Sequence, residues 1–129
     1  MMQSPHLEFE STAFDVVDGE DDETNPGIFG KSLAMWLAAQ FEVSADAVIA
    51  EDFGWCVPMK ASPHRLYIAC SSEDDRQDRW RVFVFAEGGA VARLLGRDTR
   101  VADVEALFSR IRKLLEARSD VSHLTQRKS

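Results

Sequence analysis

The last third of the chain contains the pattern that most constrains its fold. Apolar residues recur at spacings of three and four, as they do on one face of a helix: Val101, Val104, Leu107, Phe108, Ile111, Leu114 and Leu115. Asp98 and Thr99 precede this pattern and are good N-terminal caps. We therefore expect a helix that begins near residue 99 and ends near residue 118. Its apolar face requires a second apolar layer to cover it.

A second apolar stripe predicts another amphipathic helix earlier in the chain. Its members are again three and four residues apart: Phe29, Leu33, Trp36, Leu37 and Phe41. Asn25 is a candidate N-cap, and Pro26 suits the first helical position because its missing N–H costs nothing there. The expected helix runs from Pro26 to about Val43.

Alternating and short apolar runs predict the strands. We expect them at 7–17 with a break near Ser11, at 48–50, at 51–59 with a bend at Gly54, at 65–70 and at 80–85. The order of elements predicts an α+β fold, a two-layer sandwich in which two amphipathic helices cover one face of a mostly antiparallel sheet of four to five strands. We expect a single domain over 1–129, with frayed ends at 1–6 and 119–129, where Val121 and Leu124 are candidates to attach the tail to the body.

Composition and charge favour a soluble bacterial protein of the cytoplasm. Hydrophobic residues make up 45% of the chain and charged residues 29%, and the formal net charge is −7. No apolar run approaches the length of a membrane helix, and residues 1–10 lack the pattern of a secretory leader. The acidic balance argues against nucleic acid as a partner, because such binding depends on clustered Lys and Arg.

Two acidic loops are the candidate partner-binding surface. The first, at residues 18–23, has five acids and no base, and the second follows the strand at 65–70. The residues that we expect to contact a partner are Asp18, Glu20, Asp21, Asp22, Glu23, Glu73, Asp74 and Asp75. Because opposite charges raise association rates, the expected partner is a basic protein such as a toxin or effector.

The two cysteines are expected to be reduced and buried. A hairpin that turns near Ala61 would place residue 56 opposite residue 67, so that Cys56 and Cys70 do not pair. A cysteine-dependent enzyme, with His64 as base and Asp52 as acid, is a weaker alternative because no basic cluster lowers a thiol pKa. We therefore predict no catalytic residue.

Other sequence patterns do not support a cofactor or a metal. Gly30-Lys31-Ser32 resembles the end of a phosphate-binding loop, but the earlier glycine of that motif is absent and the expected helix already includes these residues. The histidines at positions 6, 64 and 123 are too far apart for a zinc motif.

Aromatic residues of the strand region provide an alternative site. Most of them are expected to pack in the core. If they lined a cleft instead, a cationic or amphipathic small molecule would fit between Trp55, Tyr67 and Trp80, with Glu51 and Asp52 at the rim.

Two motifs resemble a known group of proteins. Residues 25–31 read N-P-G-I-F-G-K, and residues 51–55 read E-D-F-G-W. Together they resemble a group of small uncharacterised bacterial proteins with an N-P-G-x-F-G-K helix start and an E-D-aromatic-G-W segment. The resemblance implies a single-domain bacterial cytosolic protein and brings no catalytic residue.

These observations favour a non-enzymatic protein-binding module of the immunity-protein type, which would neutralise a toxin through its acidic loops. A small-molecule binder or sensor with a cleft near Trp55 is the alternative, and an enzyme is less favoured. Homodimer formation is compatible with the sequence.

Overall fold

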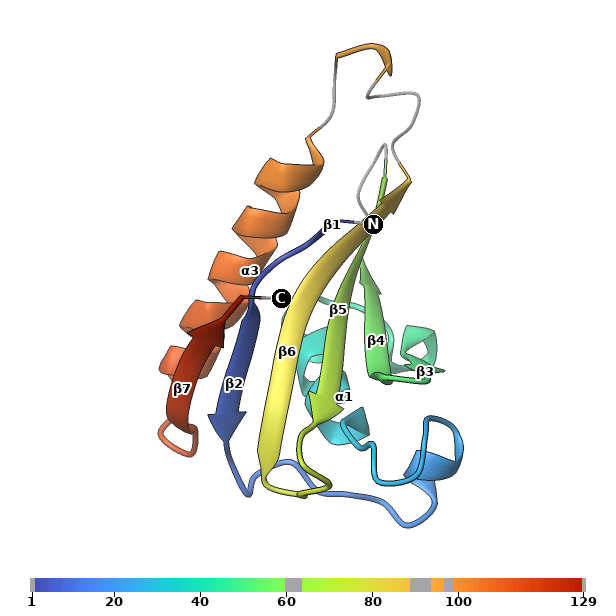
Figure 1. Ribbon diagram of the computed structural model, residues 1–129, viewed down its shortest axis with the longest axis vertical. Helices are drawn as coiled ribbons and strands as arrows, with labels where there is room; N and C mark the ends of the chain where they lie inside the picture. The colour runs from blue at the N-terminus through green and yellow to red at the C-terminus, as the bar shows by residue number, and fades with distance from the viewer. Residues whose placement is uncertain (1, 60–63, 89–93, 97–98, 129) are drawn as a thin grey trace.

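A computed structural model describes residues 2–59, 64–88, 94–96 and 99–128. These residues form a seven-stranded antiparallel sheet and two α-helices (Figure 1). The strands are β1 (Met2–Gln3), β2 (His6–Glu10), β3 (Ile49–Glu51), β4 (Gly54–Met59), β5 (His64–Ser72), β6 (Arg79–Gly88) and β7 (Ser122–Arg127). The helices are α1 (Lys31–Gln40) and α3 (Arg100–Glu116), with 3-10 turns η1 (Glu20–Asp22) and η2 (Ala45–Ala47). The expected α+β fold is confirmed.

The strands follow the order β3-β4-β5-β6-β2-β7, and β1 also pairs with β6. β1 and β2 are consecutive parts of one path along β6, interrupted at Ser4 and Pro5. At this interruption the Ser4 hydroxyl donates to the Pro5 carbonyl at 2.7 Å and accepts the Val84 N–H at 2.9 Å. The side chain thus replaces a ladder hydrogen bond where the chain bends.

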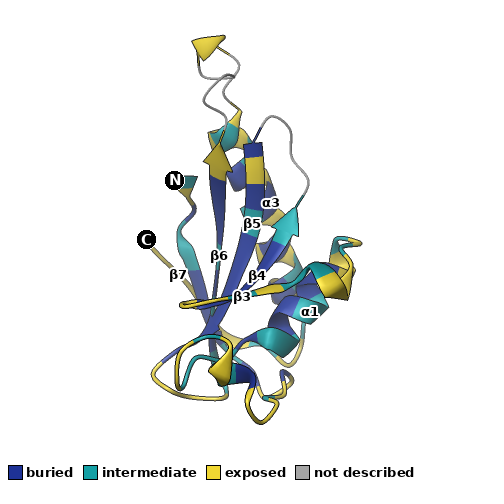
Figure 2. Ribbon diagram, turned by 90° about the vertical axis from the view of Figure 1, so that its right-hand side faces the viewer, coloured by how far each residue is buried: buried dark blue, intermediate teal, exposed yellow. Residues whose placement is uncertain are grey.

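Both helices lie on the same face of the sheet (Figure 2), as the sequence predicts. α1 lies against β4 and β5, and α3 lies against β6 and β1. Their apolar faces meet the sheet in one core that includes Leu33, Leu37, Ile68, Trp80, Val82, Ile111 and Leu115, all of them fully buried. No helix in the described part of the chain is long and apolar enough to cross a lipid bilayer.

The opposite face of the sheet, which we call the open face, has its own smaller apolar cluster. Cys56, Ala69 and Phe85 are buried there, and Tyr67 and Phe83 pack against them. Among the described residues, neither α-helix contributes to this cluster, and Figure 1 looks onto this face with the helices behind. Both α1 and α3 therefore cover the other face of the sheet.

The expectation of frayed ends is wrong, and it explains why the sheet has more strands than predicted. β1 lies within 1–6 and pairs with β6, and β7 lies within 119–129 and pairs with β2. β7 is an edge strand with mostly exposed side chains, so its sequence lacks the alternation of a half-buried strand. Val121 and Leu124 pack against the core, which attaches the tail to the body.

The prediction for the last helix is confirmed, whereas the first helix begins later than expected. α3 covers Arg100–Glu116, close to the predicted bounds. α1 begins at Lys31 rather than at Pro26 and ends at Gln40. Residues 25–30 instead form the irregular approach to the helix.

The hairpin between β4 and β5 has a different register from the predicted one. Cys56 lies opposite Ala69, and Cys70 lies opposite Trp55. Residues 60–63, where we expected the turn, lie outside the described residues. Cys56 belongs to the open-face cluster and Cys70 to the core under the helices, so the two thiols are on opposite faces of the sheet. Both are free and buried.

Candidate functional site: the acidic end of the sheet

Glu20, which we expected to contact a partner, instead caps α1 from inside the molecule. Its carboxylate accepts the N–H groups of Val17 at 2.9 Å and of Gly30 and Lys31 at 3.1 Å each. The residue is only 3% exposed. A carboxylate at a helix N-terminus satisfies free N–H groups and meets the positive end of the helix dipole. Glu20 is therefore a structural residue, and its buried carboxylate is not part of the exposed acidic surface.

Gly30-Lys31-Ser32, which resembles the end of a phosphate-binding loop, lies at the start of α1 and not inside a longer helix as we expected. Gly30 is the N-cap of α1, so the N–H groups of Gly30 and Lys31 do point out of the helix start, contrary to our expectation. The carboxylate of Glu20 occupies the place that a phosphate would take. The chain supplies its own anion there.

The two glycines of the sequence motifs allow three segments to meet at Cys70. A Cβ at position 30 would lie 2.9 Å from the Cys70 carbonyl oxygen, and a Cβ at position 54 would overlap the same oxygen. Both glycines also have positive φ, at 143° and 148°. The Asn25 side chain donates to the Asp52 carbonyl at 2.8 Å and joins the two motifs directly, so it does not cap α1.

Ser72 and Gly27 connect this junction to both acidic loops. The Ser72 hydroxyl accepts the Phe29 N–H at 2.9 Å and donates to the Gly27 carbonyl at 3.2 Å. The Asp21 carboxylate accepts the Gly27 N–H at 2.9 Å, and a Cβ on Gly27 would overlap the carboxylate of Asp75. The two loops therefore meet at Gly27, although they are far apart in the sequence.

The exposed carboxylates around this junction form a surface that we call the acidic end: Asp18, Asp22, Glu23, Asp52, Asp74 and Asp75. η1 and the β5–β6 loop both lie at the lower end of Figure 1. Asp74 and Asp75 have φ of 55° and 56°, in the left-handed region that residues other than glycine seldom adopt. The N–H of Arg76 donates to the Glu73 carbonyl at 2.9 Å and closes this tight turn.

Two further residues predicted to bind a partner have structural roles. Glu73 is buried on the open face, 3.1 Å from Arg79 and in contact with Arg81. Asp21 is half-buried against Gly27. Of the eight predicted residues, Asp18, Asp22, Glu23, Asp74 and Asp75 are exposed. The sequence could not separate the exposed acids from the buried or half-buried ones, because both occur next to each other in the same acidic runs.

The alternative pocket near Trp55 is not formed. Trp55 and Trp80 are 3% and 0% exposed and belong to the core under the helices, whereas Tyr67 lies on the open face. The Trp80 indole donates to the Ser11 carbonyl at 3.0 Å, and the Lys31 ammonium lies 5.1 Å from the Trp55 ring centroid. Glu51 and Asp52 are exposed at the β3–β4 turn.

The cysteines and His64 do not form a catalytic pair. Burial raises the pKa of Cys56 to about 12, with a further contribution from Glu51, and burial raises the pKa of Cys70 as well. His64 begins β5, far along the strand from Ala69, which lies opposite Cys56. Its Nε2 lies 3.1 Å from an Asp103 carboxylate oxygen on α3. This arrangement does not provide a thiolate with an adjacent base.

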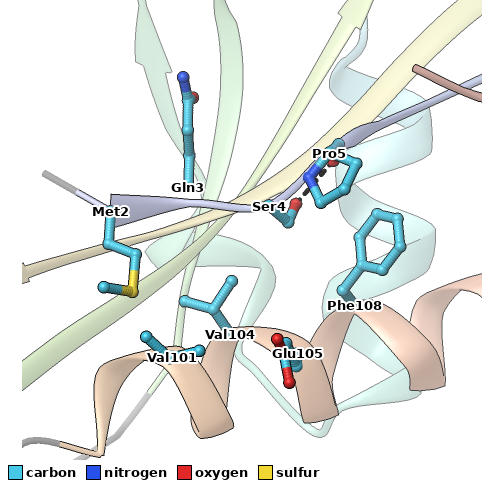
Figure 3. A pocket seen from close by; sticks show the side chains of 8 residues that line it. All are labelled: Met2, Gln3, Ser4, Pro5, Val101, Val104, Glu105 and Phe108. Atoms are coloured by element: carbon cyan, nitrogen blue, oxygen red, sulfur yellow. Dashed lines mark hydrogen bonds between the residues drawn. The ribbon is translucent and has the colours of Figure 1, made fainter. Parts of the chain in front are cut away.

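A cavity of about 270 Å³ lies elsewhere, between the N-terminal segment and α3 (Figure 3). Met2, Pro5, Val101, Val104 and Phe108 supply its apolar lining, with Gln3, Ser4 and Glu105 beside them. No described group of three or more His, Cys, Asp or Glu side chains could hold a metal ion.

The acidic end thus combines exposed carboxylates with a hydrogen-bonded junction beneath them. Comparisons of the chain with protein-family models, with curated proteins and with solved structures find no match.

Proposed function

We propose that this protein is a non-enzymatic protein-binding module that covers a basic surface of another protein with its acidic end. The observation that carries the proposal is that both acidic loops reach Gly27, where Asp21 accepts its N–H and Asp75 lies against its Cα. The loops are held by the fold, so little conformational freedom is lost when a partner binds.

The charge distribution supports a cationic partner. Asp22, Glu23 and Asp74 are exposed at one end of a chain with a net charge of −7. Such a field accelerates the encounter with a positive surface and discriminates against acidic proteins. An immunity-type protein that neutralises a basic toxin or effector is the specific form of this proposal.

The test compares two variants in which four exposed acids are replaced by their amides. The first changes the acidic end at Asp18, Asp22, Glu23 and Asp74, and leaves Glu20, Asp21 and Glu73 intact because they support the fold. The matched control changes four exposed acids elsewhere: Glu42, Asp46, Glu105 and Glu116. A partner captured from host lysate with the unmodified protein is then purified and used for association kinetics.

We expect the acidic-end variant to associate at least about 10-fold more slowly than the control variant, with a weaker dependence on salt. Equal rates for the two variants would show that the acidic end does not contact the partner, and the proposal would fail.

A further inference from the structure

The open face carries a continuous cluster of aromatic rings, and no helix in the described part of the chain packs on it. Phe53, in the β3–β4 turn, lies with its ring centroid 6.2 Å from Phe83 and 6.3 Å from Phe85. Tyr67 stacks on Phe85 at 4.9 Å, and His6 stacks on Phe83 at 4.4 Å. The cluster therefore extends from β2 across β6 to β5.

Part of this cluster remains exposed to solvent. Phe53 is 44% exposed. Ile49 is 42% exposed and pairs with Cys56 of the open-face cluster, so it lies on the same face. Large apolar side chains that share a face and remain exposed commonly mark a binding surface.

Most charges on the open face are arranged in pairs of opposite sign, and Glu51, which lies opposite Gly54 and so shares the face of Ile49, adds one exposed acid. Cross-strand neighbours are Glu8 with Arg81 and Glu10 with Arg79 on β2 and β6. At the other end of the face, Arg65 lies directly opposite Glu87. The Glu8 carboxylate is 3.6 Å from Arg79 and from Arg81, and 3.1 Å from Arg127. This face is thus nearly neutral in a chain whose net charge is −7.

We infer that the open face is the interface of a homodimer, in which a second copy of the chain packs its own open face against it. Two copies repel each other wherever their acids face one another, but a face with alternating signs can meet itself without net repulsion. In a two-fold interface the same patch occurs on both sides, so basic residues of one copy can lie against acidic residues of the other. A basic partner would be attracted to the acidic end instead.

Phe53 and Ile49 are the apolar centre of this interface, and Arg65 and Glu87 lie in its rim. Aromatic residues at the centre of an interface supply much of the binding free energy, whereas rim charges set the register. The inference is independent of the proposed function, because it rests on the apolar and paired side chains of the open face and not on Asp22, Glu23 and Asp74 of the acidic end.

Sedimentation velocity on the purified protein, from about 1 to 200 μM, tests the inference within the range of ordinary protein affinities. We expect a concentration-dependent dimer. Phe53→Ser and Ile49→Ser should each raise the dissociation constant, Phe53→Ser by about 30-fold as for a central aromatic residue. Val101→Ser is the matched control, because Val101 is 53% exposed but lies on α3 on the other side of the sheet. It should leave the dimer unchanged.

A charge exchange provides a second test that does not depend on the apolar residues. In the proposed interface the rim bases of one copy lie against the rim acids of the other. Arg65→Glu replaces such a base by an acid in both copies, so that like charges meet across the dimer, and it should weaken the dimer by about 10-fold or more. Adding Glu87→Arg reverses the pair in both copies and should restore the affinity. Circular dichroism establishes that each variant is folded. A monomer at all concentrations, a dimer that Phe53→Ser and Ile49→Ser leave intact, or no rescue by the double exchange would overturn the inference.

Discussion

Glu20 shows how one buried carboxylate can determine the shape of an acidic loop. It satisfies three N–H groups that would otherwise have no partner, two of them at the start of α1. We predict that Glu20→Gln lowers the free energy of unfolding by about 1–3 kcal/mol, because the amide nitrogen cannot accept these hydrogen bonds. Urea denaturation measures the effect.

Asp22→Asn is the control for this prediction, since Asp22 belongs to the same turn but is exposed. Its effect should stay within about 0.5 kcal/mol. If the two variants were equally stable, the contacts of Glu20 would contribute little to the fold.

Gly54 is the position at which an added methyl group should be most harmful. Its φ is 148°, and a Cβ would overlap the backbone of Cys70. We predict that Gly54→Ala lowers the free energy of unfolding by at least about 2 kcal/mol, because backbone strain and steric overlap add. Gly19→Ala separates the two effects, since Gly19 has φ of 86° but would make only an ordinary contact at 3.5 Å. Its cost should be about 1–2 kcal/mol, that of left-handed strain alone.

The thiols of Cys56 and Cys70 should be inert in the folded protein. Both are buried, and burial raises the pKa of both, so the reactive thiolate is scarce at neutral pH. We predict that a disulfide reagent modifies both thiols only at the rate of unfolding, as followed by mass spectrometry at pH 7.5 with and without denaturant. Rapid labelling of one cysteine in the native protein would restore the case for an enzyme.

At the scale of whole elements, β7 contributes to the stability of the fold although most of its side chains are exposed. It covers the edge of β2, and Arg127 contacts the buried Glu8 carboxylate at 3.1 Å. We predict that deleting residues 119–129 lowers the free energy of unfolding by at least about 3 kcal/mol, because the β2–β7 pairing and the packing of Val121 and Leu124 on the core are lost together. Deletion of residues 128–129 alone is the control and should have little effect in urea denaturation.

The elements also show which patterns a sequence can reveal. α3 could be predicted because its apolar spacing is local; the Thr99 side chain makes no cap hydrogen bond to the helix backbone, and Asp98 lies outside the described residues. The start of α1 could not, because the group that caps it, Glu20, lies ten residues before Gly30 in the sequence. The register of β4 and β5 could not be predicted, because a shift of the hairpin centre by one residue moves every cross-strand pair by two.

The whole molecule should lose stability in mild acid through His6. Burial lowers the pKa of His6 below its usual value of 6.5, and Arg81 lowers it further, against an opposing effect of Glu73. Between the native pKa and 6.5 the unfolded chain binds more protons than the folded one. The contribution of His6 to stability is therefore present above pH 6.5 and is lost as pH falls toward the native pKa.

We predict that His6→Gln reduces the slope of unfolding free energy against pH between about 5 and 7. Urea denaturation at several pH values measures this slope. His123→Gln serves as the control because its ring is exposed on β7, and the slope that His6 causes should persist there. An unchanged slope in His6→Gln would assign the acid sensitivity to other groups.

For the molecule as a whole, the sequence predicted the layers and the helix-covered face better than the site. The acidic loops were visible in the sequence as runs of like charge. Their division into supporting residues, such as Glu20 and Glu73, and exposed ones, such as Asp22 and Asp74, depends on contacts between distant segments. The aromatic cluster of the open face was expected to lie in the core. The periodicity of a strand does not show whether helices pack on both faces of its sheet or on one.

The close approach of Gly30 and Gly54 to the Cys70 backbone could help to identify related proteins. Any chain that folds in this way must bring two backbones against a third without side chains between them. In a distantly related sequence, glycines at the positions equivalent to 30 and 54 would therefore indicate common ancestry. We expect them to be retained more often than the acids of the surface.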